Sequence, residues 1–232
     1  MITILGGVAI AGGLASASPV HDRVLTVPTA ELPGAGDVIA SSSLDRHGAI
    51  GLDAGYGFGG LAELELALAD GDARDGNGLP VERSTAAFRI GAHEDAWFSG
   101  QPAIALGVRA TIGSDKATSA YVVASRRIAF VSLHLGGSLE AVVNARPTVV
   151  RPLAGLELRP PAFPKTTLLA DLSWQPTFAA TMPTEQLAFS WGVRYQALRW
   201  AAIELAVRHD ESSFGDPDVF VRVTGMWTTS PH

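Results

Sequence analysis

The chain has 232 residues, of which 47% are hydrophobic and only 17% are charged, and its formal net charge is −6. This acidic balance argues against nucleic acid as a partner, and a chain without cysteine can form neither disulfides nor thiolate metal sites. Beyond the N-terminus no apolar run reaches the ~18 residues of a membrane-spanning helix, so helical membrane spans are not expected.

The first 35 residues are expected to stand outside the folded domain. An apolar run over 2–14 precedes Ala15-Ser16-Ala17, which is a small-x-small site of the kind that signal peptidase cleaves. We therefore predict a signal peptide over residues 1–17 and an N-terminal periplasmic segment over 18–35. Because no Lys or Arg precedes the apolar run, a buried N-terminal strand or helix of the mature fold is the alternative.

The stretch LAELELALAD, residues 61–70, fits two kinds of secondary structure. Its leucines have the spacing of an amphipathic helix, and Leu, Ala and Glu are good helix formers. The same leucines also alternate with Glu63 and Glu65, as on the two faces of a strand. The segments that follow decide between the two.

Alternation with a period of two recurs along the rest of the chain. In LAFSWGVRYQ, residues 187–196, large apolar residues alternate with Ala188, Ser190, Gly192 and Arg194. Residues 61–70 are therefore also predicted to be a strand. Clusters of turn residues separate about twelve such segments. They lie near 36–45, 49–57, 60–70, 83–92, 101–112, 117–126, 128–140, 148–159, 166–175, 186–197, 200–209 and 218–228. This pattern predicts one all-β, antiparallel domain over residues 36–228 and a C-terminal tail over 229–232.

The polar faces of these strands are not those of a water-exposed sheet. The chain has only two lysines, Lys116 and Lys165, and both fall in predicted turns. The polar faces carry Gly, Ala and Ser with scattered arginines and acids. Similar numbers of Arg and carboxylate suit an enclosed lumen, because the planar guanidinium stays ionised and pairs with carboxylates bidentately. The residues predicted to line this lumen are Glu63, Glu65, Arg89, Arg109, Glu157, Arg159, Asp171, Arg194, Glu204, Arg208 and Arg222.

The connections between the predicted strands differ in length. The longer ones, at 71–82, 176–185 and 210–217, are odd-numbered along the chain, and the tight ones, at 57–60, 126–127 and 198–200, are even-numbered. Short periplasmic turns and longer external loops are typical of outer-membrane barrels. Several tryptophans lie near predicted strand ends, where aromatic girdles belong, namely Trp97, Trp174, Trp200 and Trp227.

With these features, residues 36–228 resemble a bacterial outer-membrane β-barrel of about twelve strands. The resemblance is one of architecture and includes no family motif. The last strand, VFVRVTGMW, ends on an aromatic residue as such barrels do, and residues 228–232 then depart from the pattern. The resemblance implies an antiparallel up-and-down transmembrane barrel in the outer membrane, with the lipid bilayer as its surroundings. A soluble β-sandwich or lipocalin-like binding barrel is the alternative.

The lumen charges are the strongest candidates for function. Rings of Arg opposite Glu or Asp orient and filter polar solutes, so we predict a small porin-like channel for such solutes. The alternative is a structural or partner-binding barrel whose lumen is plugged by its own side chains. Neither an oligomeric state nor a particular solute follows from the sequence.

Two other segments are weaker candidates. Residues 69–78, ADGDARDGNG, resemble a calcium loop, but Arg74 interrupts the acidic pattern, and hairpin loops need such residues for their turns. Residues 209–218, HDESSFGDPD, and the pair Ser132 and His134 contain hydrolase residue types without a catalytic motif. We expect no metal, no cofactor and no enzymatic activity, with a lipid-modifying enzyme as the competing class.

Overall fold

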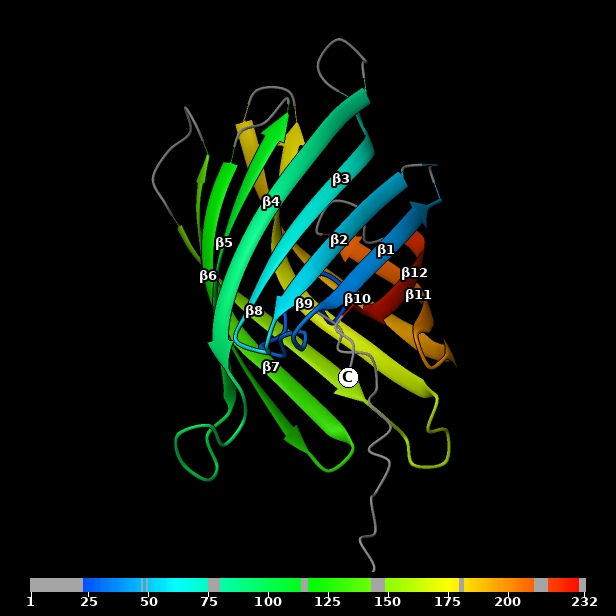
Figure 1. Ribbon diagram of the computed structural model, residues 1–232. Coiled ribbons are helices and arrows are strands. Elements are labelled where there is room, and N and C mark those ends of the chain that lie inside the picture. The colour runs from blue at the N-terminus through cyan, green and yellow to red at the C-terminus, as the bar shows by residue number, and fades with distance from the viewer. Residues whose placement is uncertain are drawn as a thin grey trace, which may run out of the picture.

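The computed structural model describes residues 23–46, 48, 50–74, 80–113, 117–142, 149–179, 182–210 and 217–229. Strands account for most of this part of the chain (Figure 1). They are β1 (Asp37–Asp45), β2 (Ile50–Phe58), β3 (Ala62–Arg74), β4 (Pro80–Ala92), β5 (Ala103–Gly113), β6 (Ala117–Ile128), β7 (Val131–Val142), β8 (Val149–Leu158), β9 (Thr166–Ala179), β10 (Met182–Leu198), β11 (Ala201–Asp210) and β12 (Asp218–Thr228). Among these described residues, no helix is long and apolar enough to cross a membrane.

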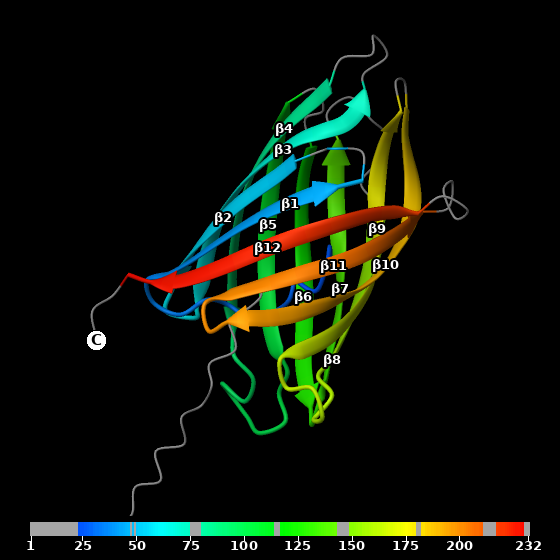
Figure 2. The same cartoon turned by 90° about the vertical axis from the view of Figure 1, so that its right-hand side faces the viewer.

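The twelve strands form one closed barrel in which each strand pairs with its neighbours in sequence. All of the pairings are antiparallel, and the barrel closes where β12 pairs with β1, from Asp37 opposite Thr228 to Asp45 opposite Phe220 (Figure 2). The β8–β9 pairing is the shortest among the described strands and runs from Ala154 opposite Leu172 to Leu158 opposite Leu168. The predicted all-β, up-and-down barrel of about twelve strands is confirmed, and LAELELALAD is a strand.

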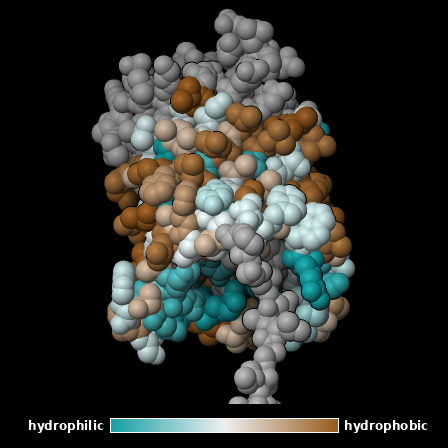
Figure 3. Space-filling view, in the orientation of Figure 1, coloured by the Kyte–Doolittle hydropathy of each residue, from teal (hydrophilic) through white to brown (hydrophobic). Residues whose placement is uncertain are grey.

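The outer surface of the barrel is apolar. The leucines of β3 point outward, and Leu66 and Leu68 are each 58% exposed, whereas Glu65 between Leu64 and Leu66 is buried. The same division holds on β5, where Leu106 and Val108 face outward. Figure 3 shows the resulting hydrophobic surface around the strands, with hydrophilic residues gathered near one end. An apolar surface this extensive is unfavourable in water and matches the hydrocarbon of a bilayer.

Aromatic side chains concentrate at one end of the barrel. This end contains the connections β4–β5, β6–β7, β8–β9 and β10–β11 and the last residues of β12. The exposed aromatic residues there are Trp97, Phe98, Phe130, Phe163, Trp200 and Trp227. The rings of Trp200 and Trp227 lie 5.9 Å apart between centroids. Of the predicted girdle tryptophans, Trp97, Trp200 and Trp227 share this end, and the side chain of Trp174 lies outside the described residues.

The predicted asymmetry of the connections is wrong in part. Residues 176–185 are not a loop, because β9 and β10 continue as a paired hairpin up to Ala179 and Met182. The connection 71–82 is shorter than predicted, since β3 reaches Arg74 and β4 begins at Pro80. Long connections at 93–102 and 159–165 lie at the even-numbered end instead. The sequence QPTFAATMPTE of this hairpin, residues 175–185, lacks the apolar alternation of the other strands and therefore resembles a loop.

Residues 23–35, which belong to the segment predicted over 18–35, lie inside the barrel, and residues 18–22 lie outside the described residues. Val24, Leu25 and Val27 have no exposed surface, and Leu32 is buried as well. Figure 1 shows this segment among the strands. Its apolar residues lack a strand-like period, so their packing against the inner wall could not be predicted from the sequence. The signal peptide predicted over residues 1–17 lies outside the described residues.

Candidate functional site: the barrel interior

Alternation along the strands turns the predicted charges toward the interior. Glu63 and Arg89 lie opposite each other in the β3–β4 register. Arg89 Nε donates a hydrogen bond to Glu63 Oε2, and both side chains are buried. Directly opposed residues of unlike charge stabilise a strand pair, so this contact follows from the register.

A second group of charges spans β8, β10, β11 and β12. Arg194 Nε lies 2.8 Å from Glu204 Oε1, and Arg194 Nη1 lies 3.3 Å from Glu157 Oε1. Glu204 also pairs with Arg222 at 3.4 Å, and Glu157 with Arg159 at 3.2 Å. These five side chains are hereafter the Arg194 network. Each carboxylate in it contacts two guanidinium groups, which is how charges are kept ionised away from bulk water.

The other predicted residues take different places. Arg208 pairs with Asp218 at 2.7 Å, toward the ends of β11 and β12 and apart from the Arg194 network. Arg109 on β5 is partly buried, and its Nε has no hydrogen-bond partner among the described residues. Glu65 binds Arg23, and Asp171 binds backbone amides. Both of these partners belong to the segment inside the barrel, at residues 23–35.

Asp171 on β9 is the main anchor of this segment. Its Oδ2 atom accepts hydrogen bonds from the backbone amides of Leu25, Thr26 and Val27 at 3.2, 2.5 and 3.0 Å. The Thr26 hydroxyl adds a fourth contact at 3.1 Å and also lies 3.0 Å from Ser173 Oγ. Consecutive backbone amides converging on one oxygen form an anion-binding nest, here filled by a side chain of the wall.

Arginines of the wall bind the carbonyls of the same segment. Arg194 Nη2 donates to the Arg23 and Val24 carbonyls at 2.9 and 2.8 Å. Arg222 Nη2 donates to the Leu25 carbonyl at 3.0 Å. On the opposite side, Arg89 Nη1 donates to the Thr29 carbonyl at 2.8 Å. Three of the predicted lumen arginines therefore hold backbone as well as carboxylates.

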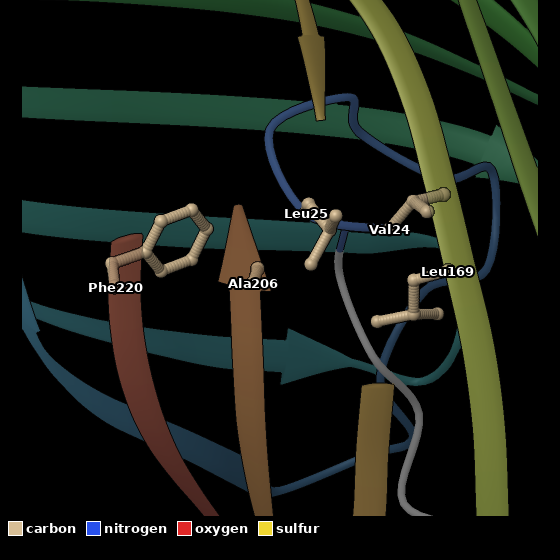
Figure 4. Packing of buried hydrophobic residues seen from close by; sticks show 5 residues of the cluster. All are labelled: Val24, Leu25, Leu169, Ala206 and Phe220. Atoms are coloured by element: carbon tan, nitrogen blue, oxygen red, sulfur yellow. The ribbon is translucent and has the colours of Figure 1, made fainter. Parts of the chain in front are cut away.

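Apolar contacts complete the docking of the segment. Val24 and Leu25 pack in a buried cluster with Leu169, Ala206 and Phe220, which come from β9, β11 and β12 (Figure 4). A second buried cluster joins Ala30 to apolar residues of β5 and β6, namely Ala103, Ala105 and Val123. Apolar side chains on the inner wall are unexpected in a water-filled lumen. They are present here because they pack against the apolar residues of the segment.

Two glycines of the wall make room for the segment. A Cβ atom at Gly155 on β8 would lie 2.8 Å from Val24 Cγ2. A Cβ atom at Gly57 on β2 would lie 2.6 Å from Pro33 Cβ and closer still to the Gly34 carbonyl. Both distances are too short for a side chain, so glycine is required where the backbone comes this close.

Glu31 links the segment to the aromatic end of the barrel. Its carboxylate lies 3.3 Å from Arg127 Nη2 of β6, and the side chain is about one-third exposed. Burial raises the pKa of Glu31 above its usual value, and the Arg127 guanidinium opposes that rise. Docking of the segment therefore makes the Glu31 carboxylate easier to protonate.

The hydrolase candidates do not form a catalytic group among the described residues. His134 Nδ1 lies 2.7 Å from Ser125 Oγ on β6, and Ser125 Oγ also accepts a hydrogen bond from the Ala30 amide at 2.8 Å. Ser132, by contrast, lies 3.4 Å from Arg127 Nε. Of the acidic loop proposed for calcium, residues 75–79 lie outside the described residues. Elsewhere in the described part no group of three potential metal ligands occurs.

Several interior residues were missed by the sequence analysis. Arg151 on β8 is buried, and Ser125 is buried beneath the segment. Arg151 has the same strand parity as Glu157, so the alternation could have placed it on the inner face. Arg23 and Arg127 could not be assigned this way, because their roles depend on where the segment docks.

No family model and no curated protein matches this sequence. Solved structures of outer-membrane porins share its fold. The KdgM porin has a TM-score of 0.61 at 10% identity, with 84% of this chain and 99% of that chain covered. The NanC porin has a TM-score of 0.54 at 8% identity, with the same coverage of both chains. A further match, with a TM-score of 0.60 at 10% identity, again covers 84% of this chain and 99% of the other and is described as the KdgM porin in complex with disordered oligogalacturonate. The fold of this chain is that of the outer-membrane porins.

Proposed function

We propose that this protein is a small porin-like channel that carries polar solutes across the outer membrane of a bacterium. The observation that carries the proposal is the contrast between the two faces of one closed barrel. Outward side chains are apolar and fit lipid, whereas the inner wall holds buried ion pairs such as Arg89 with Glu63 and Arg194 with Glu204. An interior that meets water or polar solutes accounts for this number of charged side chains on the inner wall.

Charges on opposite sides of the interior give the path its selectivity. Arg89 and Glu63 lie on β3 and β4, whereas the Arg194 network spans β8 to β12. Opposed charged groups of this kind set up a transverse field that orients dipolar solutes. Arg109 is a partly buried arginine on the inner face of β5, and its charge contributes to this field.

The similar structures support polar solutes as the class. One is described as a porin in complex with oligogalacturonate, which makes the same fold a host for a polar oligosaccharide in that protein. For this chain the solute is assigned only as small and polar.

The segment at 23–35 favours a second candidate function, a structural or partner-binding barrel with a plugged lumen. Its contacts with Asp171 and Arg194 place backbone where a solute would pass. A barrel of this kind would act through its external connections and would not conduct.

Planar-bilayer conductance of the refolded mature protein separates the two candidates. A channel gives discrete current steps that grow with salt concentration. Leu106→Ala, which changes only the outward face of β5, serves as the matched control and should leave the steps unchanged. A protein that folds as a heat-modifiable β-barrel and never conducts would be the plugged barrel.

A further inference from the structure

We propose that the inner wall contains a binding site for the main chain of a bent peptide, and that residues 23–33 occupy this site as a removable plug. The site consists of Asp171, Arg194, Arg222, Arg89 and Ser125, which are hereafter the plug site. The proposal concerns binding and does not require the channel function to be correct.

The barrel is complete without the plug. Every strand has two neighbours, and the β1–β12 pair closes the sheet along its length. The plug contributes no strand to this sheet. Within the described residues its backbone forms one bridge, between Arg23 and Pro28, and the Pro33 carbonyl accepts one hydrogen bond from the Gly60 amide of the β2–β3 connection. Removing it therefore breaks no ladder of the barrel.

Recognition runs mainly through the backbone of the plug. Asp171 accepts three consecutive amides, and Arg194, Arg222 and Arg89 donate to four carbonyls of residues 23–29. Ser125 accepts the amide of Ala30. Contacts of this kind select the chain direction and the bend of the peptide backbone, whereas side-chain pockets select its sequence.

The wall arginines keep partners when the plug leaves. Arg194 retains Glu157 and Glu204, and Arg222 retains Glu204. Water can replace the carbonyls that these guanidinium groups lose, so no buried charge is left alone by the departure. Among the described charged residues of the wall, Asp171, Glu65 and Arg127 lose a partner in the plug, and water can replace these partners as well.

The plug lies across the interior. Its polar contacts reach β3, β4, β6, β9, β10 and β12, and its apolar clusters add β5 and β11. These strands are distributed around most of the barrel. A docked plug therefore narrows any path through the barrel, and its departure widens that path.

A reversible cross-link tests whether the plug leaves. The hydroxyls of Thr26 and Ser173 lie 3.0 Å apart, and the chain has no cysteine, so the double variant T26C/S173C offers a single disulfide at a suitable separation. The full chain is refolded and placed in planar bilayers. Oxidation should lower the time-averaged current at least tenfold, and a reductant should restore it. The single variant T26C should not respond. Equal currents in the oxidised and reduced double variant would overturn the plug.

A binding experiment tests the site without relying on conductance. Leu25→Asp in the full chain places a charge in the apolar cluster and should release the plug while leaving the wall intact. A fluorescein-labelled peptide of residues 23–33, RVLTVPTAELP, is then titrated into L25D protein in detergent and followed by anisotropy. We expect the peptide to bind L25D protein at least tenfold more tightly than it binds the wild type, whose site is occupied. It should also bind L25D at least tenfold more tightly than it binds L25D/D171N.

Two controls make this titration specific for the backbone. D53N, in the L25D background, makes the same chemical change at an inward carboxylate that bonds Ser41, and it should leave peptide binding unchanged. A peptide N-methylated at the Leu25 and Val27 amides lacks two of the donors to Asp171 and should bind at least tenfold more weakly. Equal binding of the native peptide to L25D, L25D/D171N and wild-type protein would overturn the site. Tight binding by a protein that never conducts would keep the site and overturn the channel.

Discussion

The two faces of β10 show that side chains on the outside and on the inside of this barrel require different surroundings. Outward, Phe189, Trp191 and Val193 are exposed and need only an apolar solvent around them. Inward, Ser190 and Arg194 are buried. Arg194 meets two carboxylates and two backbone carbonyls, so its partners come from β8, β11 and residues 23–24. The outer face tolerates any residue of the right polarity, whereas the inner face depends on particular partners.

The largest expected effect comes from removing a shared partner inside. Glu204→Ala leaves Arg194 and Arg222 short of a carboxylate in a buried setting. We expect a loss of about 3 kcal/mol in the free energy of unfolding, measured by denaturant titration in lipid vesicles. Glu204→Gln keeps the volume and one acceptor and should lose less. A loss no greater than that of the outward variant Leu66→Ala would contradict the difference between the two faces.

Placing a charge on the outer face should have the next largest effect. Leu66 is an exposed outward residue of β3, and Leu66→Arg turns a guanidinium toward hydrocarbon. The expected cost in the free energy of unfolding in vesicles is roughly 2–4 kcal/mol near the bilayer midplane. Leu66→Phe is the apolar control and should cost little. If the arginine were harmless in vesicles, the outer face would not be in contact with lipid.

A third variant distinguishes the plug from the wall. Leu25→Ala removes buried contacts with the cluster around Leu169 and Phe220. Docking of the plug should weaken by about 2 kcal/mol, which is roughly a 30-fold rise in the population of the undocked form. Single-channel recordings measure this as a higher open fraction. The denaturation midpoint of the barrel should stay that of the wild type, and a large fall would show that the plug is part of the folded core.

The smallest expected effect is a dependence of docking on pH. The pKa of Glu31 is raised by burial when the plug is docked, so the docked form binds protons more readily than the undocked form. Docking should therefore strengthen as pH falls from above this raised pKa toward about 4.5, and the open fraction should decrease. Arg127, Arg159, Glu94 and Glu157 act on the same carboxyl group. Glu31→Gln should reduce the pH dependence of the open fraction. If the variant has the same pH dependence as the wild type, that dependence arises from other groups.

The barrel could be predicted from the sequence because each strand has its own alternation of apolar and polar or small residues. Alternation of apolar and small or charged residues placed Glu63 and Arg89 on one face, and the hairpin order then made them opposite neighbours. Glu204 with Arg222 and Arg208 with Asp218 follow from the same two facts. Local periodicity and neighbour pairing are both short-range, so they can be read without a structure.

The plug and its site could not be read in this way. The partners of Asp171 are backbone amides about 145 positions away, and backbone amides have no sequence signature. Residues 24–32 have no strand period that would assign their apolar side chains to a wall. The prediction of a loop at 176–185 failed for a related reason, because this paired hairpin lacks the alternation that identifies the other strands. Sequence reasoning worked where residues alternate between two unlike faces and failed where they do not.

The most direct test of the channel is the reversal potential of wild-type and Arg109→Ala protein in planar bilayers under a tenfold salt gradient. If solutes pass along the inner wall, removing this positive charge should shift the reversal potential toward greater cation selectivity, while the outward variant Leu106→Ala keeps the wild-type value. Identical reversal potentials in all three proteins, or folded barrels that carry no current, would contradict a conducting interior lined by these charges.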